Sequence, residues 1–394
     1  MKAYSKYKDV SLPWLSAIPS HWDVIRNKVI LTESKETVGS EHSNYQLLSL
    51  TRNGVIVRDI TNGKGKFPSD FSSYKIVNEG QIIFCLFDIE ETPRTIGISK
   101  HDGMITGAYD IFSIKGTNPV YLEYYYISLD DVKAMSPLYT GLRKTIGINT
   151  FMQTLLPRPP RPEQDQIVRF LDWKVSKINK LINVRKKQIR LLQEKRKAVI
   201  NKTVNEQKEH IKFKYLLTIK SGEALINSHL SDNNVYPVYG GGKLIGYYHE
   251  YNVCKDNILL GRVGANCGCV TRLESNAFAT DNALVVTTKH NLDYIEYLLT
   301  SANLNSLNES NAQPLITGYK VLNFSTRYSS DLQIQNAIVS YLDQKVSTID
   351  KIIDKLSDEI KLFTEYRIRL ISDVVTGKLD VRDVVVPEFE KVED

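Results

Sequence analysis

The sequence predicts an α+β protein in which two α/β domains are joined by two long helices that form an antiparallel coiled coil. Three observations support this fold class. One segment of the chain occurs twice, both copies carry a heptad pattern of apolar residues, and short β-rich runs precede each copy. The duplication predicts that an approximate two-fold axis relates the two halves.

The repeat is read directly from the sequence. Residues 167–204 align with residues 338–375 without a gap, and 16 of these 38 positions are identical. Lys174-Val175-Ser176, for example, falls on Lys345-Val346-Ser347. Because unrelated helices would not share sequence in this way, we interpret the chain as a tandem duplication.

Both copies read as long helices with one apolar seam. Apolar residues recur at steps of four and three, which is typical of a coiled coil. The predicted seam consists of Leu171, Val175, Ile178, Ile182, Ile189, Leu192, Leu342, Val346, Ile349, Ile353, Leu356 and Ile360. Two unrelated amphipathic helices on separate cores would explain the heptads but not the repeat. A helix of about 40 residues is roughly 60 Å long.

The segments before the helices are rich in short β-strand patterns and lack the heptad repeat. Residues 80–87 and 111–114 read as strands in the first domain, and residues 257–261 and 282–287 read as strands in the second. A tyrosine-rich helical segment follows in each, at residues 120–127 and 292–299, where packing is a better reading than base stacking. The predicted domains are residues 1–156 and 206–330, the predicted helices are residues 157–205 and 331–376, and residues 377–394 form a tail. Because the helices kept their sequence while the domains diverged, we expect the helices to share one role and the domains to contact different targets.

Composition excludes several classes of protein. Apolar residues make up 42% and charged residues 24%, which argues against disorder and collagen-like repeats. No run approaches the ~18 apolar residues of a membrane span, and no signal-peptide core begins the chain, so we expect a cytoplasmic protein without a membrane partner. The net charge of +6 is concentrated in residues 163–204, which hold twelve basic and four acidic residues. This basic helix would face DNA phosphates, face an acidic partner, or simply be solvated.

No catalytic or metal-binding pattern stands out. The four cysteines, Cys85, Cys254, Cys267 and Cys269, should be reduced thiols in the cytosol. Three of them could join His249 in a zinc site, but the spacing fits no standard zinc motif, so we expect no metal. Phosphate-binding loops, zinc-protease motifs, nucleophile elbows and the Asn/Asp-Pro-Pro-Tyr/Phe motif of amino-methyltransferases are all missing from the sequence. We therefore expect no catalytic residues in this chain.

Several motifs resemble one known family. Residues 155–167 read LLPRPPRPEQDQI and residues 371–382 read ISDVVTGKLDVR, which are similar to the entry of the first helix and the exit of the second in type I restriction–modification specificity subunits. Ile18-Pro19-Ser20-His21-Trp22 resembles the opening of that family. Residues 236–242, 261–264 and 280–283 resemble its target-recognition pattern. One departure is that residues 328–335 lack the Pro-Pro-x-x-Glu-Gln entry to the second helix.

The resemblance implies a non-catalytic, DNA-binding subunit. Each target-recognition domain would read one half of a bipartite site in double-stranded DNA, and the helices would set the gap between the halves. Two methyltransferase subunits carrying S-adenosylmethionine would bind the helices, and two restriction subunits using ATP and magnesium would join for cleavage. No cofactor would be bound by this chain itself.

The residues that would touch DNA are chosen by type and by position in probable loops. Arginine and lysine suit guanine and phosphate, whereas asparagine suits adenine. The candidates are Arg52, Asn53, Lys64, Lys66, Arg94, Thr95, Arg143 and Lys144 in the first domain, and Tyr239, Lys243, Arg262, Asn266, Thr317 and Lys320 in the second. For each of them an exposed, solvated side chain or a turn-forming role is an equally good reading.

Two other functions remain open from the sequence. The chain could be a coiled-coil scaffold that organises protein partners without reading DNA. It could also be a self-sufficient nuclease or methyltransferase, although the missing motifs argue against that class.

Overall fold

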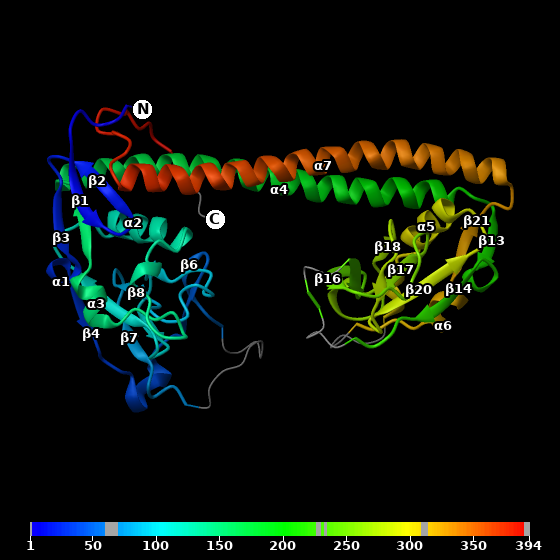
Figure 1. Ribbon diagram of the computed structural model, residues 1–394, viewed down its shortest axis with the longest axis horizontal. Coiled ribbons are helices and arrows are strands. Elements are labelled where there is room, and N and C mark those ends of the chain that lie inside the picture. The colour runs from blue at the N-terminus through cyan, green and yellow to red at the C-terminus, as the bar shows by residue number, and fades with distance from the viewer. Residues whose placement is uncertain (1, 60–69, 226–229, 232–234, 309–313, 390–394) are drawn as a thin grey trace. The chain divides into compact units, whose positions relative to one another are not determined.

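The structure is a computed structural model that describes residues 2–59, 70–225, 230–231, 235–308 and 314–389. The chain divides into two compact units. Unit 1 comprises Met1–Arg185 and Asp358–Asp394, and unit 2 comprises Lys186–Ser357. Two long helices, α4 (Arg161–Asn205) and α7 (Leu332–Val375), each contribute one portion to either unit (Figure 1).

Local sequence explains where the long helices begin and end. The prolines that precede α4 confine the chain to strand β12 (Leu155–Arg158), and the helix starts directly after Pro160. Helix α7 lacks these prolines and begins instead after Asp331, whose carboxylate accepts a hydrogen bond from the Gln333 amide at 2.7 Å. It ends before Gly377, which has a φ of +77°. A Cβ atom there would lie 2.3 Å from Pro19, so only glycine fits.

Polar pairs join α4 to α7 within each unit. In unit 1, Arg367 Nη1 donates to Asn179 Oδ1 at 2.7 Å and Arg185 Nε donates to Glu359 Oε2 at 2.6 Å, so the two helix portions run in opposite directions. In unit 2, Arg196 Nε donates to Asp350 Oδ1 at 2.9 Å. Arg196 and Arg367 are equivalent positions of the repeat, and so are Asn179 and Asp350. The duplication has therefore preserved the same cross-helix pairing in both units.

The seam positions are covered to different degrees. Leu171, Ile178 and Ile182 are buried in the core of unit 1, and Leu342 and Val346 are buried in the core of unit 2. Ile349 is also buried. The remaining seam residues are half-buried: Val175, Ile189, Leu192, Ile353, Leu356 and Ile360.

Unit 1 is built on a four-stranded antiparallel sheet with strand order β4-β11-β8-β9. Its strands are β1 (Tyr7–Leu12), β2 (Leu15–Pro19), β3 (Asp23–Arg26), β4 (Leu31–Ser34), β5 (Leu48–Thr51), β6 (Gly54–Val57), β7 (Lys75–Val77), β8 (Ile82–Phe84), β9 (Ile96–Ile98), β10 (Gly103–Ile105), β11 (Asp110–Ile114) and β12. Its shorter helices are α1 (Asn27–Ile30), α2 (Pro119–Asp131) and α3 (Ile148–Gln153). Four fully buried aromatic rings, Phe84, Phe112, Tyr126 and Phe151, pack together over the sheet.

Unit 2 has a four-stranded antiparallel sheet with strand order β14-β20-β17-β18. Its strands are β13 (Glu209–Lys212), β14 (Leu217–Ser221), β15 (Tyr236–Gly240), β16 (Lys243–Tyr248), β17 (Ile258–Gly261), β18 (Val270–Arg272), β19 (Phe278–Ala279), β20 (Ala283–Thr288) and β21 (Ser325–Tyr328). Its shorter helices are α5 (Leu292–Ser301) and α6 (Gly318–Asn323). Strands β15, β16 and β19 form a second, three-stranded sheet.

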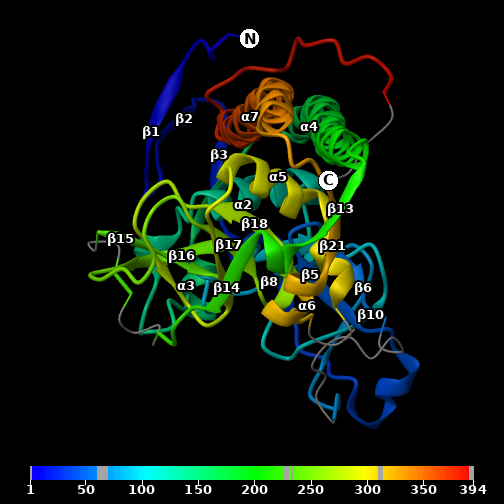
Figure 2. The same cartoon turned by 90° about the vertical axis from the view of Figure 1, so that its right-hand side faces the viewer.

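The two sheets have the same topology although their sequences differ. In each, the first strand pairs with the fourth, and the second and third form a hairpin beside it. A helix then follows, α2 in unit 1 and α5 in unit 2, and lies between the sheet and a long helix (Figures 1 and 2). Asn118 and Asn291 cap these helices, because each side chain accepts a hydrogen bond from a backbone N–H of the first turn.

The predicted elements correspond well to the observed ones. The strands predicted at residues 80–87, 111–114, 257–261 and 282–287 are confirmed as β8, β11, β17 and β20, although β8 is shorter than predicted. The helices predicted from the tyrosine-rich segments are confirmed as α2 and α5. None of the helices described is long and apolar enough to span a membrane.

Candidate nucleic-acid interface

In unit 2 the candidate residues gather around the loop that follows β17. Arg262 leaves this strand and is held from two sides, because its Nη1 donates to Ser221 Oγ at 3.1 Å and to the Asp281 carbonyl at 3.2 Å. Its own carbonyl accepts from the Ile316 amide at 2.9 Å. Two chain segments therefore hold the half-buried guanidinium, and a third holds the backbone of Arg262. Arginine has five N–H donors in a fixed fork, so a side chain held through Nη1 can still present its other donors to a base or phosphate.

Glycines allow this convergence. A Cβ atom on Gly261 would lie 2.0 Å from the Asn266 carbonyl oxygen, and one on Gly222 would lie 2.2 Å from the Thr280 carbonyl oxygen. Contacts this short exclude any side chain at either position. Close backbone packing next to Arg262 thus explains Gly261 of the glycine pattern seen in the sequence.

Other candidates of the second domain surround the same loop. Asn266 lies in the loop itself, and Thr317 follows Ile316 and caps α6 by accepting from the Lys320 amide at 3.4 Å. The Tyr239 carbonyl accepts from the Thr280 amide, next to Asp281. Lys243 is exposed at the start of β16, directly after the glycine run. Lys320 is partly engaged elsewhere, since its Nζ donates to the Leu307 carbonyl at 3.3 Å.

In unit 1, Arg143 and Lys144 lie in the segment between α2 and α3 and contact the loop that follows β8, which is the equivalent of the loop after β17. The Leu86 carbonyl accepts from the Ile146 amide at 2.8 Å, just as the Arg262 carbonyl accepts from Ile316 in unit 2. Arg143 grips Asp88 with two donors, one of them Nε to Oδ1 at 3.1 Å, and its guanidinium lies 5.1 Å from the Phe87 ring centre. The hydrogen bond from Arg143 lowers the pKa of Asp88. Lys144 faces Glu90 at 3.6 Å.

The remaining first-domain candidates lie elsewhere. Arg52 and Asn53 form the exposed tip of the β5–β6 hairpin, where the Thr51 hydroxyl accepts from the Asn53 amide at 3.2 Å. Lys64 and Lys66 fall outside the described residues.

The structure places Arg94 and Thr95 in contacts inside unit 1 rather than on an open surface. Thr95 is 1% exposed, and its hydroxyl donates to Asp130 Oδ1 at 2.7 Å. Arg94 Nη1 lies 3.2 Å from Asp130 Oδ2 and 3.0 Å from Asp131 Oδ1, so its charge is compensated inside the unit. Both residues fix the chain before β9 to the end of α2.

The sequence analysis also missed residues at these loops. Asp88, Phe87 and Ser221 hold the two candidate arginines, yet none belongs to a residue type or motif that marked it. The one available signal is position, because Ser221 ends strand β14 and Phe87 and Asp88 lie in the loop that follows β8.

The cysteines do not assemble a cluster. Cys85 and Cys267 are buried, and this burial raises the pKa of both thiols. Cys254 and Cys269 are exposed. Among the residues that the structure describes, no group of three or more histidine, cysteine, aspartate or glutamate side chains is placed to hold a metal ion.

The chain was compared with known proteins. Residues 205–362 match the family model of the type I restriction modification DNA specificity domain. The type I restriction enzyme EcoprrI specificity subunit of Escherichia coli is 26% identical over 269 residues, which is 63% of this chain and 64% of that protein, less than two thirds of its length.

A solved structure shares the fold of the whole chain. The solved structure comes from a study of complex assembly and conformational transition in the type I restriction–modification system. The two chains superpose with a TM-score of 0.65 and are 13% identical in sequence, and the match covers 92% of this chain and 99% of the other. The resemblance drawn from the motifs is thereby confirmed: residues 205–362 match the model of a type I restriction modification DNA specificity domain, and the chain is similar in sequence to a type I specificity subunit.

Proposed function

We propose that this chain is the non-catalytic, DNA-binding specificity subunit of a type I restriction–modification complex. Each β-rich domain would read one half of a bipartite site in double-stranded DNA. The observation that carries the proposal is the pair of sheets with the same strand order, which present different basic residues at equivalent places: Arg143 and Lys144 contact the loop after β8, and Arg262 lies in the loop after β17. A duplicated scaffold with different loops is suited to reading two different half-sites. The match of residues 205–362 to a DNA specificity domain supports it, and nothing favours a scaffold that does not read DNA.

In this proposal the long helices pair as an antiparallel coiled coil along their length. Helix α4 has 45 residues and α7 has 44. At 1.5 Å per residue each is about 65 Å long, which exceeds the ~34 Å of one turn of DNA. The coiled coil would therefore fix the gap between half-sites. The helices would also dock two methyltransferase subunits.

The proposed partners supply the chemistry. S-adenosylmethionine would be held by the methyltransferase subunits, and ATP with magnesium would be held by two restriction subunits. This chain would bind and orient the DNA, while a target adenine would be flipped into a pocket of the partner. The location would be the cytoplasm, where bacterial DNA is accessible.

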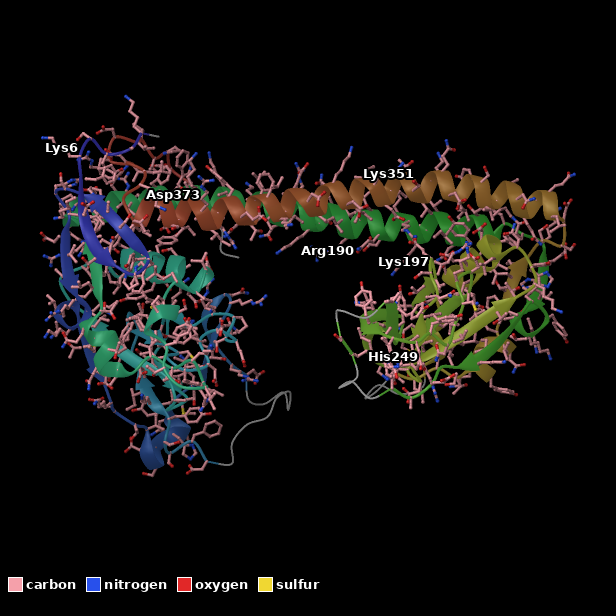
Figure 3. All side chains as sticks on the ribbon, viewed as in Figure 1. Lys6, Arg190, Lys197, His249, Lys351 and Asp373 are labelled. Atoms are coloured by element: carbon pink, nitrogen blue, oxygen red, sulfur yellow. The ribbon has the colours of Figure 1, made fainter. Side chains whose placement is uncertain are left out.

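A basic stripe on α4 supports contact with phosphates near the second half-site. We use this name for Lys186, Arg190 and Lys197, all exposed and all in unit 2. Arg190, Lys197 and Val204 are spaced seven residues apart and therefore lie on one face of α4. Because Val204 is buried in the core of unit 2, this face is the one toward the sheet of that unit. In Figure 3, Arg190 and Lys197 accordingly lie on this side of the helix, whereas Lys351 lies on the opposite side of α7.

The repeat shows that two of the three stripe residues are specific to one copy. The positions equivalent to Lys186 and Lys197 in α7 are Ser357 and Ile368, whereas Arg190 corresponds to the basic Lys361. Packing cannot explain this difference, because the stripe residues are exposed. We infer that they interact with something that approaches unit 2 and carries negative charge.

Mapping N6-methyladenine in cells with and without this gene tests the proposed function. We expect one bipartite methylated motif to disappear on deletion and to return when the gene is restored. A methylation pattern that is unchanged by deletion would contradict the proposal. As a control, deleting the gene of the proposed methyltransferase partner should remove the same motif.

A further inference from the structure

One short motif survives in both β-rich domains although the rest of their sequences have diverged. Asn118-x-x-Tyr-x-Glu-Tyr124 starts α2, and Asn291-x-x-Tyr-x-Glu-Tyr297 starts α5. The two helices occupy equivalent places after sheets of the same strand order. The motif is therefore common to two domains that otherwise differ, and its contacts show what it holds.

The first and last residues of the motif bind the long helix. In unit 1, Asn118 Nδ2 donates to Asp165 Oδ1 at 2.7 Å, and the Tyr124 hydroxyl donates to Asp172 Oδ1 at 2.8 Å. The two acceptors lie one heptad apart on α4.

Unit 2 repeats the arrangement on α7. Asn291 Nδ2 donates to Asn336 Oδ1 at 2.9 Å, and the Tyr297 hydroxyl donates to Asp343 Oδ1 at 2.7 Å. The acceptors are again one heptad apart, and they are the repeat equivalents of Asp165 and Asp172. Burial and the hydrogen bond to Asp343 both raise the pKa of Tyr297, so its hydroxyl remains a donor at physiological pH.

The glutamate of the motif faces the other way, toward the sheet. Glu123 Oε1 accepts from the Ile98 amide of β9 at 2.9 Å. Glu296 lies 3.7 Å from Arg272 of β18, which is the equivalent outer strand of unit 2. The motif thus joins one sheet to one long helix in each unit.

Two hydrogen bonds a heptad apart do more than one could. A single contact would leave the sheet free to pivot on the helix surface, whereas two contacts a heptad apart remove this pivoting and fix the crossing angle between α2 or α5 and its long helix. We propose that Tyr124 and Tyr297, with their acceptors Asp172 and Asp343, are positioning residues that hold each recognition domain at one angle to its long helix. They thereby restrict the gap that the two half-sites can have. This inference rests on the proposed function, because it concerns how that function is made selective for spacing.

The test uses a pool of DNA duplexes with a randomised central region. Full-length chain with its methyltransferase partner selects from the pool, and sequencing reports both half-sites and the distribution of gap lengths between them. The variants are Tyr124→Phe, Tyr297→Phe and the double variant, each of which removes a hydroxyl but keeps the ring. Asp172→Asn with Asp343→Asn is the conservative variant, since an amide oxygen still accepts. Tyr215→Phe is the matched control, because Tyr215 is 66% exposed and lies outside the motif.

We expect the double variant to enrich the same half-sites with a broader gap distribution. The fraction of selected duplexes with a gap other than the wild-type one should rise at least threefold. Each single variant should give a smaller rise, and the Asp→Asn variant and the control should match wild type. If the double variant is too unstable to purify, the single variants carry the same test.

Three results would overturn the inference. An unchanged gap distribution in a folded Tyr→Phe variant would show that the hydroxyls contribute only to stability. A changed half-site would show that they act in reading DNA rather than in positioning. If wild type itself enriches no bipartite motif, the proposed function fails, and the inference fails with it; this outcome is distinguished by the behaviour of the wild-type chain.

Discussion

Asp130 provides a sharp test of how unit 1 is held together. This carboxylate is 2% exposed at the end of α2. It accepts from Lys133 Nζ at 2.7 Å, from Thr95 Oγ1 at 2.7 Å and from the Thr95 amide at 3.1 Å, and it lies 3.2 Å from Arg94 Nη1. Asp130→Ala removes all four interactions at once and leaves Arg94 and Lys133 each with one partner fewer.

The expected loss of stability follows from burial. Breaking a buried ion pair by removing one partner costs about 3–5 kcal/mol, because a charge is left without compensation. Arg94 keeps Asp131 at 3.0 Å, so we expect a value near the lower limit, about 3 kcal/mol. For a unit of this size that corresponds to a melting temperature lower by about 6–12 °C.

The chain has a built-in probe for this measurement. All three tryptophans, Trp14, Trp22 and Trp173, lie in unit 1. Thermal unfolding followed by tryptophan fluorescence therefore reports unit 1 selectively. Asp23→Ala is the matched control, since Asp23 is 66% exposed in its pair with Arg158 and should cost no more than about 1 kcal/mol.

Equal melting temperatures for Asp130→Ala and Asp23→Ala would refute the reasoning. The same variants also test the role assigned to Arg94 and Thr95. Below its melting transition, Asp130→Ala should select the wild-type half-sites from a randomised duplex pool. A changed first half-site would show that this cluster reads DNA after all.

Four further outcomes are expected. Arg262→Ala should weaken or relax recognition of the second half-site alone, by about 1–3 kcal/mol as measured by competition binding at fixed salt, and an effect on the first half-site would contradict the assignment. Replacing the basic stripe with glutamines should make the dependence of log Kd on log salt shallower, and an unchanged slope would remove the phosphate contact. Burial raises the pKa of Glu296 above its usual 4.5, although Arg272 opposes this shift. The folded state therefore binds more protons than the unfolded state, and wild type loses stability as the pH rises above 4.5. Glu296→Gln should therefore gain stability relative to wild type between about pH 4 and pH 7 in urea unfolding followed by circular dichroism, and a constant difference would contradict the sign. Inserting seven residues after Arg185 and seven after Leu356 keeps the heptad phase and lengthens each helix by about 10.5 Å. The recognised gap should then grow while both half-sites persist. An altered half-site would argue against helices that set the gap.

The long helices and central strands could be predicted because their signals are local. The heptad pattern needs only the sequence of one segment, and apolar runs such as residues 258–261 mark a buried strand in the same way. The start of α7 was harder, since it depends on the single cap Asp331 rather than on the prolines that precede α4. Local patterns thus explain most of the element boundaries.

The candidate site was predicted less completely because it depends on contacts between distant segments. Arg262 could be found because glycines beside a strand mark close backbone packing. Arg94 and Thr95 looked similar in sequence, but Asp130, 35 residues after Thr95, folds back to bind both. The sequence drew attention to the two tyrosine-rich segments, but the role of the Asn-x-x-Tyr-x-Glu-Tyr motif could be recognised only from its contacts with the long helices.

Because of the duplication, α4 and α7 can be compared position by position, and the identical positions can be divided into buried and exposed ones. Identical positions that are buried, such as Leu171 and Leu342, are explained by packing. Leu191 and Leu362 are identical as well, yet they are 54% and 63% exposed. Burial in the core of either unit therefore does not explain why these two residues are alike. A protein that binds twice, once to each long helix, should therefore be sought first at these two leucines.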